Sequence, residues 1–266
     1  MGTSKGYGGS AGAKPVRDPI REWIEGAEDG GSGGRGDGGE DQPRPPRPDD
    51  DLPGVPRLPT VSPRVLRSLA ALGGLFASGA AGGRSGSGGG GRVAGGRNPT
   101  KVARSGGLAA SAGYGSRGGP DQQQAFVDHA LQPADLAGLG PMEQALRIKE
   151  AAAPDGEQLD DDEINQANCN FAMWIVEQGP GIAPDDVVRR WLVEYIWVVW
   201  QREVGNELNG LDSKQRQRRE EQMKAVLENR MAIADITLDG VTPADFQQAI
   251  QEALETLEVI FGTEQP

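Results

Sequence analysis

The sequence predicts an all-α fold: a C-terminal helical bundle of about five or six helices, preceded by a long Gly/Pro-rich, mostly disordered N-terminal region. Four of the five tryptophans lie after residue 119, whereas 31 of the 41 glycines lie in the first 118 residues. From about residue 121 onward, apolar side chains recur at helical spacing, and strand signals are absent. A packed core can therefore be built only in the second half of the chain.

Composition and charge divide the chain into three parts. Residues 1–56 mix glycine, proline and charge with too few apolar side chains to offset the entropy of ordering, so they are predicted to be disordered. Residues 57–118 form a basic Gly-rich region, and residues 119–266 form an acidic all-helical domain. The first 118 residues carry a net charge of +5 (16 basic, 11 acidic), and the remainder carries −17 (11 basic, 28 acidic).

A short helix is predicted within the first part, near residues 18–28. Asp18 is a suitable N-cap, and Pro19 suits the first helical position. An apolar stripe at helical spacing follows, made of Ile20, Trp23 and Ile24. Because an isolated helix of this length is marginal in water, it needs a partner, either the C-terminal domain or another protein.

Two short helices are predicted in the Gly-rich region, over about 63–78 and 99–112. Ser62 and Asn98 each place a capping side chain directly before a proline. The glycine-rich linker between these helices contains a GxGxxG match, but no strand precedes it, so composition accounts for the match.

The same region must be weighed as a nucleic-acid arm, since it holds nine basic residues and no acidic one. The arginines that could contact nucleic acid are Arg64, Arg67, Arg92, Arg97 and Arg104. These charges are dilute and few aromatic side chains accompany them, which favours contact with the protein's own acidic half. A nucleic-acid-binding or scaffold protein that uses residues 57–118 stays the alternative.

The sequence of the acidic domain predicts a series of helices. Asp121 caps the first, and further helices are expected from Pro141 and over residues 160–178, 184–204, 213–235 and 242–261. The helix over 184–204 has almost no polar face in its second half, which places it in the middle of a bundle. Its aromatic side chains could form a ligand pocket, but helical spacing favours core packing.

Candidate catalytic residues are few. The chain has one histidine and one cysteine, so Cys169 with His129 is the only nucleophile and base pair available. Cys169 is expected to pack like a small apolar residue, and His129 to lie near a helix end. The three aspartates at 160–162 most simply stabilise a helix start, and they lack the spacing of a calcium loop. We therefore expect no enzyme activity, no metal site and no resident cofactor.

The number of cysteines and the hydropathy of the chain indicate the cellular compartment. A single cysteine and the lack of a charged-then-apolar leader predict a cytoplasmic, reduced protein. The most apolar stretch, residues 65–83, is rich in glycine and alanine and carries Arg67, so a small-residue helix is favoured over a membrane span.

The opening residues Met1 to Gly9 read MGTSKGYGG and precede a glycine- and proline-rich stretch and an acidic helical region. In this plan, and most closely in those nine residues, the chain resembles the QatB family of the bacterial Qat (QueC-associated) anti-phage defence system. The resemblance implies a non-catalytic protein encoded beside an ATPase (QatA), a QueC-like enzyme (QatC) and a TatD-like nuclease (QatD). The long GSGGGG insertion departs from a compact family pattern.

The resemblance implies that the N-terminal glycine is a substrate. A 7-deazaguanine would be joined to Gly2 through an amide by the QueC-like partner. The residues expected to hold the tail in that partner's site are Thr3, Ser4, Tyr7, Gly8 and Gly9.

Elementary chemistry is compatible with this role. Methionine before glycine is normally removed, and the resulting α-amine has a pKa of about 7.7 to 8.0, against about 10.4 for lysine, so a useful fraction is nucleophilic at neutral pH. A coil of 56 residues would have a reach of roughly 40 Å. N-myristoylation also begins at Met-Gly, but it wants serine or threonine where this chain has Gly6.

Overall fold

The computed structural model describes residues 14–25, 65–67, 69–71, 98–117, 131, 133–152 and 162–262. These residues are 82% helical and include no strand, so the predicted all-α class is confirmed for the part of the chain described. The predicted caps at Ser62 and Asp121 lie outside these ranges.

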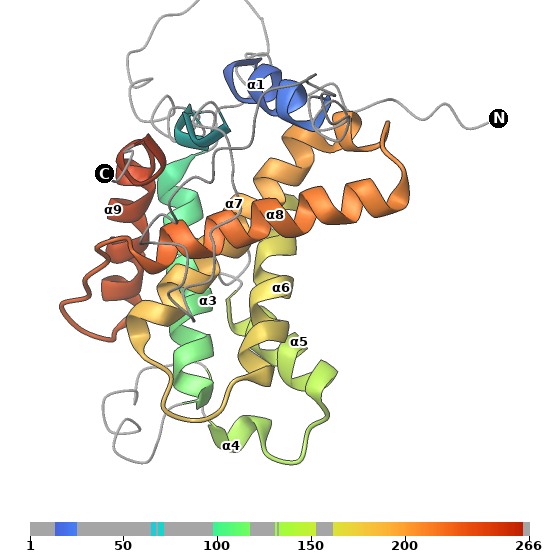
Figure 1. Ribbon diagram of the computed structural model, residues 1–266. Helices are drawn as coiled ribbons and strands as arrows, with labels where there is room; N and C mark the ends of the chain where they lie inside the picture. Colours follow the sequence, from blue (N-terminus) through green and yellow to red (C-terminus); the bar gives the residue numbers. More distant parts are fainter. Residues whose placement is uncertain are drawn as a thin grey trace, which may run out of the picture.

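The helices follow one another along the chain as Figure 1 shows. A short helical stretch within 65–71 falls between the first two elements named here. The bounds are α1 Lys14–Glu25, α3 Pro99–Arg117, α4 Pro133–Leu136, α5 Pro141–Ala151, α6 Asp162–Glu177, α7 Pro184–Leu208, α8 Ser213–Ala232 and α9 Pro243–Gly262.

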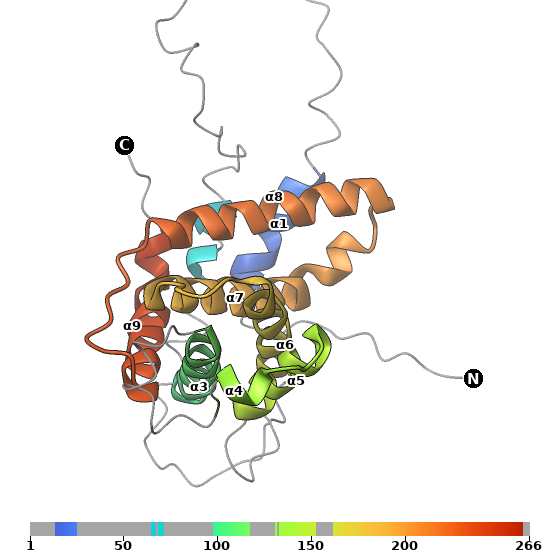
Figure 2. The same cartoon turned by 90° about the horizontal axis from the view of Figure 1, so that it is seen from below.

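Helix α7 lies in the middle of the bundle, as its apolar sequence predicted. Every residue from 191 to 200 is buried. Figure 2 shows α7 between α8 on one side and α3 and α6 on the other, while α1 also packs against it. A helix that is apolar on all sides must be covered on all sides, so α7 determines where its neighbours lie.

Helix α3 is the main difference between the predicted and the observed fold. Composition assigned it to the Gly-rich region, but it runs to Arg117 and packs against α5, α6, α7 and α9. Most of its residues are buried, including Ser105, Gly106 and Gly107. The helical domain expected over 119–266 therefore includes α3 as well.

The glycines of α3 allow this close packing. A Cβ atom at Gly106 would lie 2.6 Å from the ring of Trp191, and one at Gly113 would lie 2.9 Å from the ring of Phe171. Both distances are shorter than atoms tolerate, so the aromatic side chains of α6 and α7 occupy space that any larger residue would fill. Glycine lowers intrinsic helix propensity, and tertiary packing offsets that cost here.

A buried hydrogen-bond chain joins α3, α6 and α7 at the same point. The Nε1 of Trp191 donates to Oδ1 of Asn168 over 2.9 Å, and the Nδ2 of Asn168 donates to Oγ of Ser105 over 3.2 Å. All three side chains are at most 1% exposed. Because an unpaired buried polar group is costly, these bonds favour one rotation of the three helices about their axes.

Arg117 ties the end of α3 to the end of α6. Its Nε donates to the carbonyl of Ile175 over 2.8 Å, and its Nη2 donates to the carbonyl of Val176 over 2.7 Å. These carbonyls belong to the last turn of α6, where a cation is favourable. Burial lowers the pKa of the Arg117 guanidinium from its usual value.

Several predicted helix ends are confirmed. Asn98 Oδ1 accepts from the backbone N–H groups of Thr100 and Lys101, and α9 begins with a reciprocal pair between Thr242 and Asp245. Those hydrogen bonds from Thr242 lower the pKa of the Asp245 carboxyl. The predicted break after α6 contains Gly181 at φ +87°, a conformation that favours glycine.

Helix α1 begins earlier than its sequence predicted. It starts at Lys14, so Asp18 is an interior residue and not the N-cap, and Pro19 stands inside the helix. Proline there removes one backbone hydrogen bond, and the docking of α1 on the bundle compensates for the loss.

We expect Gly106→Ala to lower the free energy of unfolding by about 1–3 kcal/mol, because the added methyl group collides with Trp191. Gly205→Ala is the matched control, since Gly205 is also helical and its added Cβ meets nothing within 4 Å. The control should gain up to about 1 kcal/mol from helix propensity. Urea unfolding followed by circular dichroism measures both, and equal effects of the two substitutions would contradict the close α3–α7 contact.

We further expect a fragment of residues 98–266 to melt cooperatively and a fragment of residues 119–266 not to do so. The shorter fragment lacks α3 and leaves Trp191 and Phe171 without their cover. Thermal melts by circular dichroism test this difference. A cooperative melt of the shorter fragment at the same temperature would place the domain boundary at residue 118 after all.

Candidate functional site

The candidate modification residue Gly2 and the recognition residues Thr3, Ser4, Tyr7, Gly8 and Gly9 lie outside the described residues. Helix α1 is the described element that follows them directly in the chain. Its position therefore constrains where the N-terminal motif can reach.

Helix α1 docks on its own domain. Ile20 is fully buried and Ile24 is 3% exposed, and the helix packs against α7. Trp23 lies partly buried under the guanidinium of Arg219 on α8, with 4.5 Å between Cζ and the ring centroid. A cation at this distance from an indole face is attracted to it, so α1 is held by apolar and cation–π contacts together. Of the two partners that the sequence left open for this helix, the structure shows the C-terminal domain.

This docking shortens the reach expected from the sequence. The estimate of roughly 40 Å assumed 56 free residues, but α1 is anchored from Lys14 onward. Only residues 3–13 separate Gly2 from the start of α1. A coil of this length has a root-mean-square reach of roughly 20 Å, about half of the 40 Å expected for 56 residues, and a fully extended length of at most about 43 Å.

Sequence reasoning did not find Arg219. It belongs to the segment KQRQRREEQ of α8, whose charged and amide side chains are typical of an exposed helix face and are mostly exposed. Arg219 is only partly exposed, and burial lowers the pKa of its guanidinium. The sequence did contain a related signal, because Trp23 lies on an amphipathic helix that needs a partner. It did not show which residue that partner would be.

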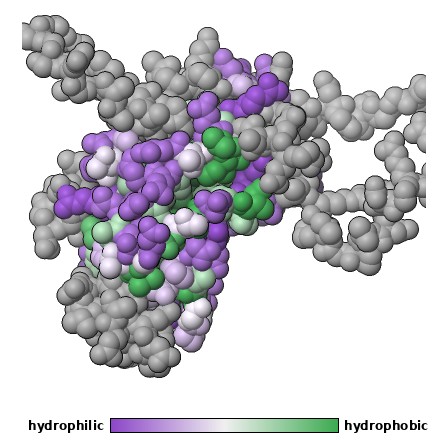
Figure 3. Space-filling view, turned by 90° about the vertical axis from the view of Figure 1, so that its left-hand side faces the viewer, coloured by the Kyte–Doolittle hydropathy of each residue, from purple (hydrophilic) through white to green (hydrophobic). Residues whose placement is uncertain are grey.

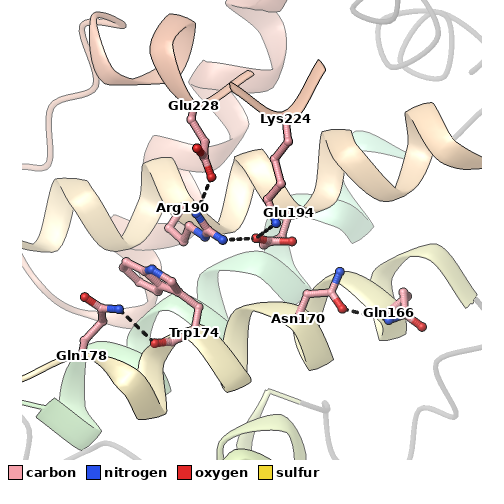
Figure 4. A network of polar contacts seen from close by, with 8 residues as sticks. All are labelled: Gln166, Asn170, Trp174, Gln178, Arg190, Glu194, Lys224 and Glu228. Atoms are coloured by element: carbon pink, nitrogen blue, oxygen red, sulfur yellow. Dashed lines mark hydrogen bonds and ion pairs between the residues drawn. The ribbon is translucent and has the colours of Figure 1, made fainter. Parts of the chain in front are cut away.

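A second group of charges lies between α6, α7 and α8 (Figure 4). The carboxylate of Glu194 is 2.5 Å from Arg190 Nη2 and 3.3 Å from Lys224 Nζ, and Arg190 also reaches Glu228 at 2.8 Å. Glu194 is 2% exposed. Arg190 also lies over the Trp174 ring, 5.3 Å from its centroid. The buried carboxylate of Glu194 is therefore neutralised by two cations, and the ion pairs to Lys224 and Glu228 hold α8 against α7.

The candidate catalytic pair is not brought together by any described contact. Cys169 is half-buried on α6, and His129 lies outside the described residues, as do Asp160 and Asp161. Asp162 is exposed in the first turn of α6, where it suits the helix dipole. Among the residues described, no group of three or more metal-ligating side chains is found.

Some of the arginines that could contact nucleic acid are described by the structure, and others are not. Arg67 and Arg104 are exposed, whereas Arg64, Arg92 and Arg97 lie outside the described ranges. A further basic side chain of the region, Arg117, donates to carbonyls of α6. Most residues of α3, the longest described part of the basic region, are buried, while its described candidate arginines are exposed.

The face that Figure 3 shows is mainly hydrophilic, with apolar side chains in a few separate places. The large apolar residues that are exposed are Met142, Leu146, Met173, Ile233 and Val259. No helix within the described ranges combines the length and apolarity that crossing a membrane requires.

Comparison of the chain with protein-family models, curated proteins and solved structures finds no match.

We expect the protein to bind duplex DNA more weakly than about 1 µM at physiological salt, because its net charge is −12 and helix α3 is buried. Fluorescence anisotropy at two salt concentrations measures this affinity. The comparison variant replaces Arg64, Arg67, Arg92, Arg97 and Arg104 with glutamine. A tighter, salt-sensitive complex that this variant loses would support the nucleic-acid alternative.

Proposed function

We propose that this protein is a non-catalytic component of an anti-phage defence complex, and that its functional group is the α-amine of Gly2. A QueC-like partner joins a 7-deazaguanine to this amine through an amide bond. The protein acts in the bacterial cytoplasm with that enzyme, an ATPase and a TatD-like nuclease. The observation that carries the proposal is the N-terminal sequence MGTSKGYGG and its resemblance to the QatB family.

The chemistry required of this chain is small. After Met1 is removed, the neutral Gly2 nitrogen attacks an activated carboxyl carbon of the deazaguanine held by the partner. A C–N bond forms, the activating group leaves with its electron pair, and the nitrogen loses a proton to a base. The partner supplies the activated acyl donor, and this chain supplies the nucleophile.

Glycine suits this step for two physical reasons. Its α-amine titrates near pH 8, well below a lysine side chain, so more of it is neutral at pH 7. The absence of a Cβ atom lets the backbone enter a narrow site. Lys5 would compete poorly as a nucleophile because its ammonium group stays protonated at neutral pH.

The helical domain serves in this proposal as the body that carries the N-terminal motif. Its anchored helix α1 keeps Gly2 within about 43 Å of Lys14, while α1 itself is held by Ile20, Ile24 and the Trp23–Arg219 contact. A modified terminus on such a body labels the whole complex and not a free peptide.

Co-expression with the QueC-like partner should yield an N-terminal peptide that has lost Met1 and gained one amide-linked deazaguanine on Gly2. Tandem mass spectrometry of the digested protein locates the added mass. Gly2→Leu should abolish the modification, because methionine before leucine is retained and the nucleophile stays blocked. Gly12→Leu is the matched control outside the motif and should be modified normally.

Thr3→Ala, Ser4→Ala and Tyr7→Ala should slow the modification without abolishing it, since these residues hold the tail but do not react. An unmodified Gly2 in a complex that still defends against phage would refute the proposal, as would full defence by Gly2→Leu.

A further inference from the structure

We infer that the face formed by α1 and the first half of α8 is the docking surface for the enzyme that acylates Gly2. This inference rests on the proposed function and names the surface that its partner uses. The face, called the α1–α8 face below, consists of α1 and residues 213–222 of α8, with Trp23 and Arg219 at their contact.

Chain length is the first argument. The recognition motif ends at Gly9, and only Ser10 to Ala13 separate it from the first residue of α1. The five Cα–Cα steps from Gly9 to Lys14 span at most about 18 Å. An enzyme domain is wider than this distance, so an enzyme that grips residues 2–9 must lie against the surface around α1.

The anchoring of α1 is the second argument, because it decides which surface that is. Ile20 and Ile24 are buried, and Trp23 lies under Arg219, so α1 is part of the domain and not a free extension. Helix α1 packs mainly on α7, and the contact between Trp23 and Arg219 joins α1 to the first half of α8. The neighbouring surface is therefore that half of α8.

Charge is the third argument and defines the chemistry of the partner. Residues 213–222 hold four basic and two acidic side chains, a net charge of +2, on a chain whose net charge is −12. Lys214 and Arg218 are exposed and stand four positions apart, so they share one side of α8. A partner with acidic residues around its peptide entrance fits this surface, and its encounter is accelerated by the opposite charges.

The test measures acylation of the full-length chain by the partner enzyme under steady-state conditions. Arg218→Glu reverses an exposed charge on the α1–α8 face, and Arg147→Glu makes the same change on α5 at the other end of the bundle in Figure 1. Arg218→Glu should raise KM at least about tenfold with kcat unchanged, because docking contributes to binding and not to the chemical step. Arg147→Glu should leave both constants unchanged. The KM difference should shrink at high salt.

Two further substrates sharpen the test. A synthetic peptide of residues 2–13 lacks the face and should be acylated with the kcat of the full chain but a higher KM. Arg219→Gln removes the cation over Trp23 and should also raise KM, because α1 no longer holds the motif beside the face.

Equal KM values for Arg218→Glu and Arg147→Glu, or for the peptide and the full chain, would overturn the docking surface while leaving the proposed function intact. Faster acylation of Arg219→Gln would also overturn it, by showing that α1 must leave the domain first. Acylation of neither the peptide nor the full chain would refute the proposed function and this inference with it.

Discussion

The contact between Trp191 and Gly106 is the constraint on which the rest of the bundle depends. Helix α7 is buried on every side over residues 191–200 and apolar there except for the paired Glu194, so its largest side chains need neighbours that approach closely. The absence of a Cβ at Gly106 gives the Trp191 ring its space on α3. The chain from Trp191 through Asn168 to Ser105 then holds α6 in the same register. Once these three helices meet, α5 and α9 cover α3, and α8 and α1 cover α7.

Cations over aromatic rings join α7 to α6 and α8 to α1. Arg190 lies over Trp174 and pairs with Glu194, while Arg219 lies over Trp23 and brings α1 onto the bundle. Guanidinium groups suit these positions because they stack on rings while keeping donors for carboxylates. An acidic protein thus uses several of its arginines to attach peripheral helices.

The proposed function separates chemistry from structure along the chain. In that proposal the reactive group is a backbone amine at one end, and the folded domain holds that end near α1. A partner that contacted the short motif and the folded surface together would bind more tightly than through either alone.

The helical class, the helix starts at Asn98 and Thr242, and the central place of α7 could be predicted from the sequence, because they follow from local capping chemistry and from apolar periodicity along one segment. The N-terminal motif is also visible in the sequence and depends on no fold. That α3 belongs to the core and that Trp23 meets Arg219 became visible in the folded molecule. Composition indicates disorder for a glycine-rich segment because it counts side chains, whereas the stability of α3 comes from the rings of Trp191 and Phe171, which lie far away in the sequence and approach its glycines only after folding.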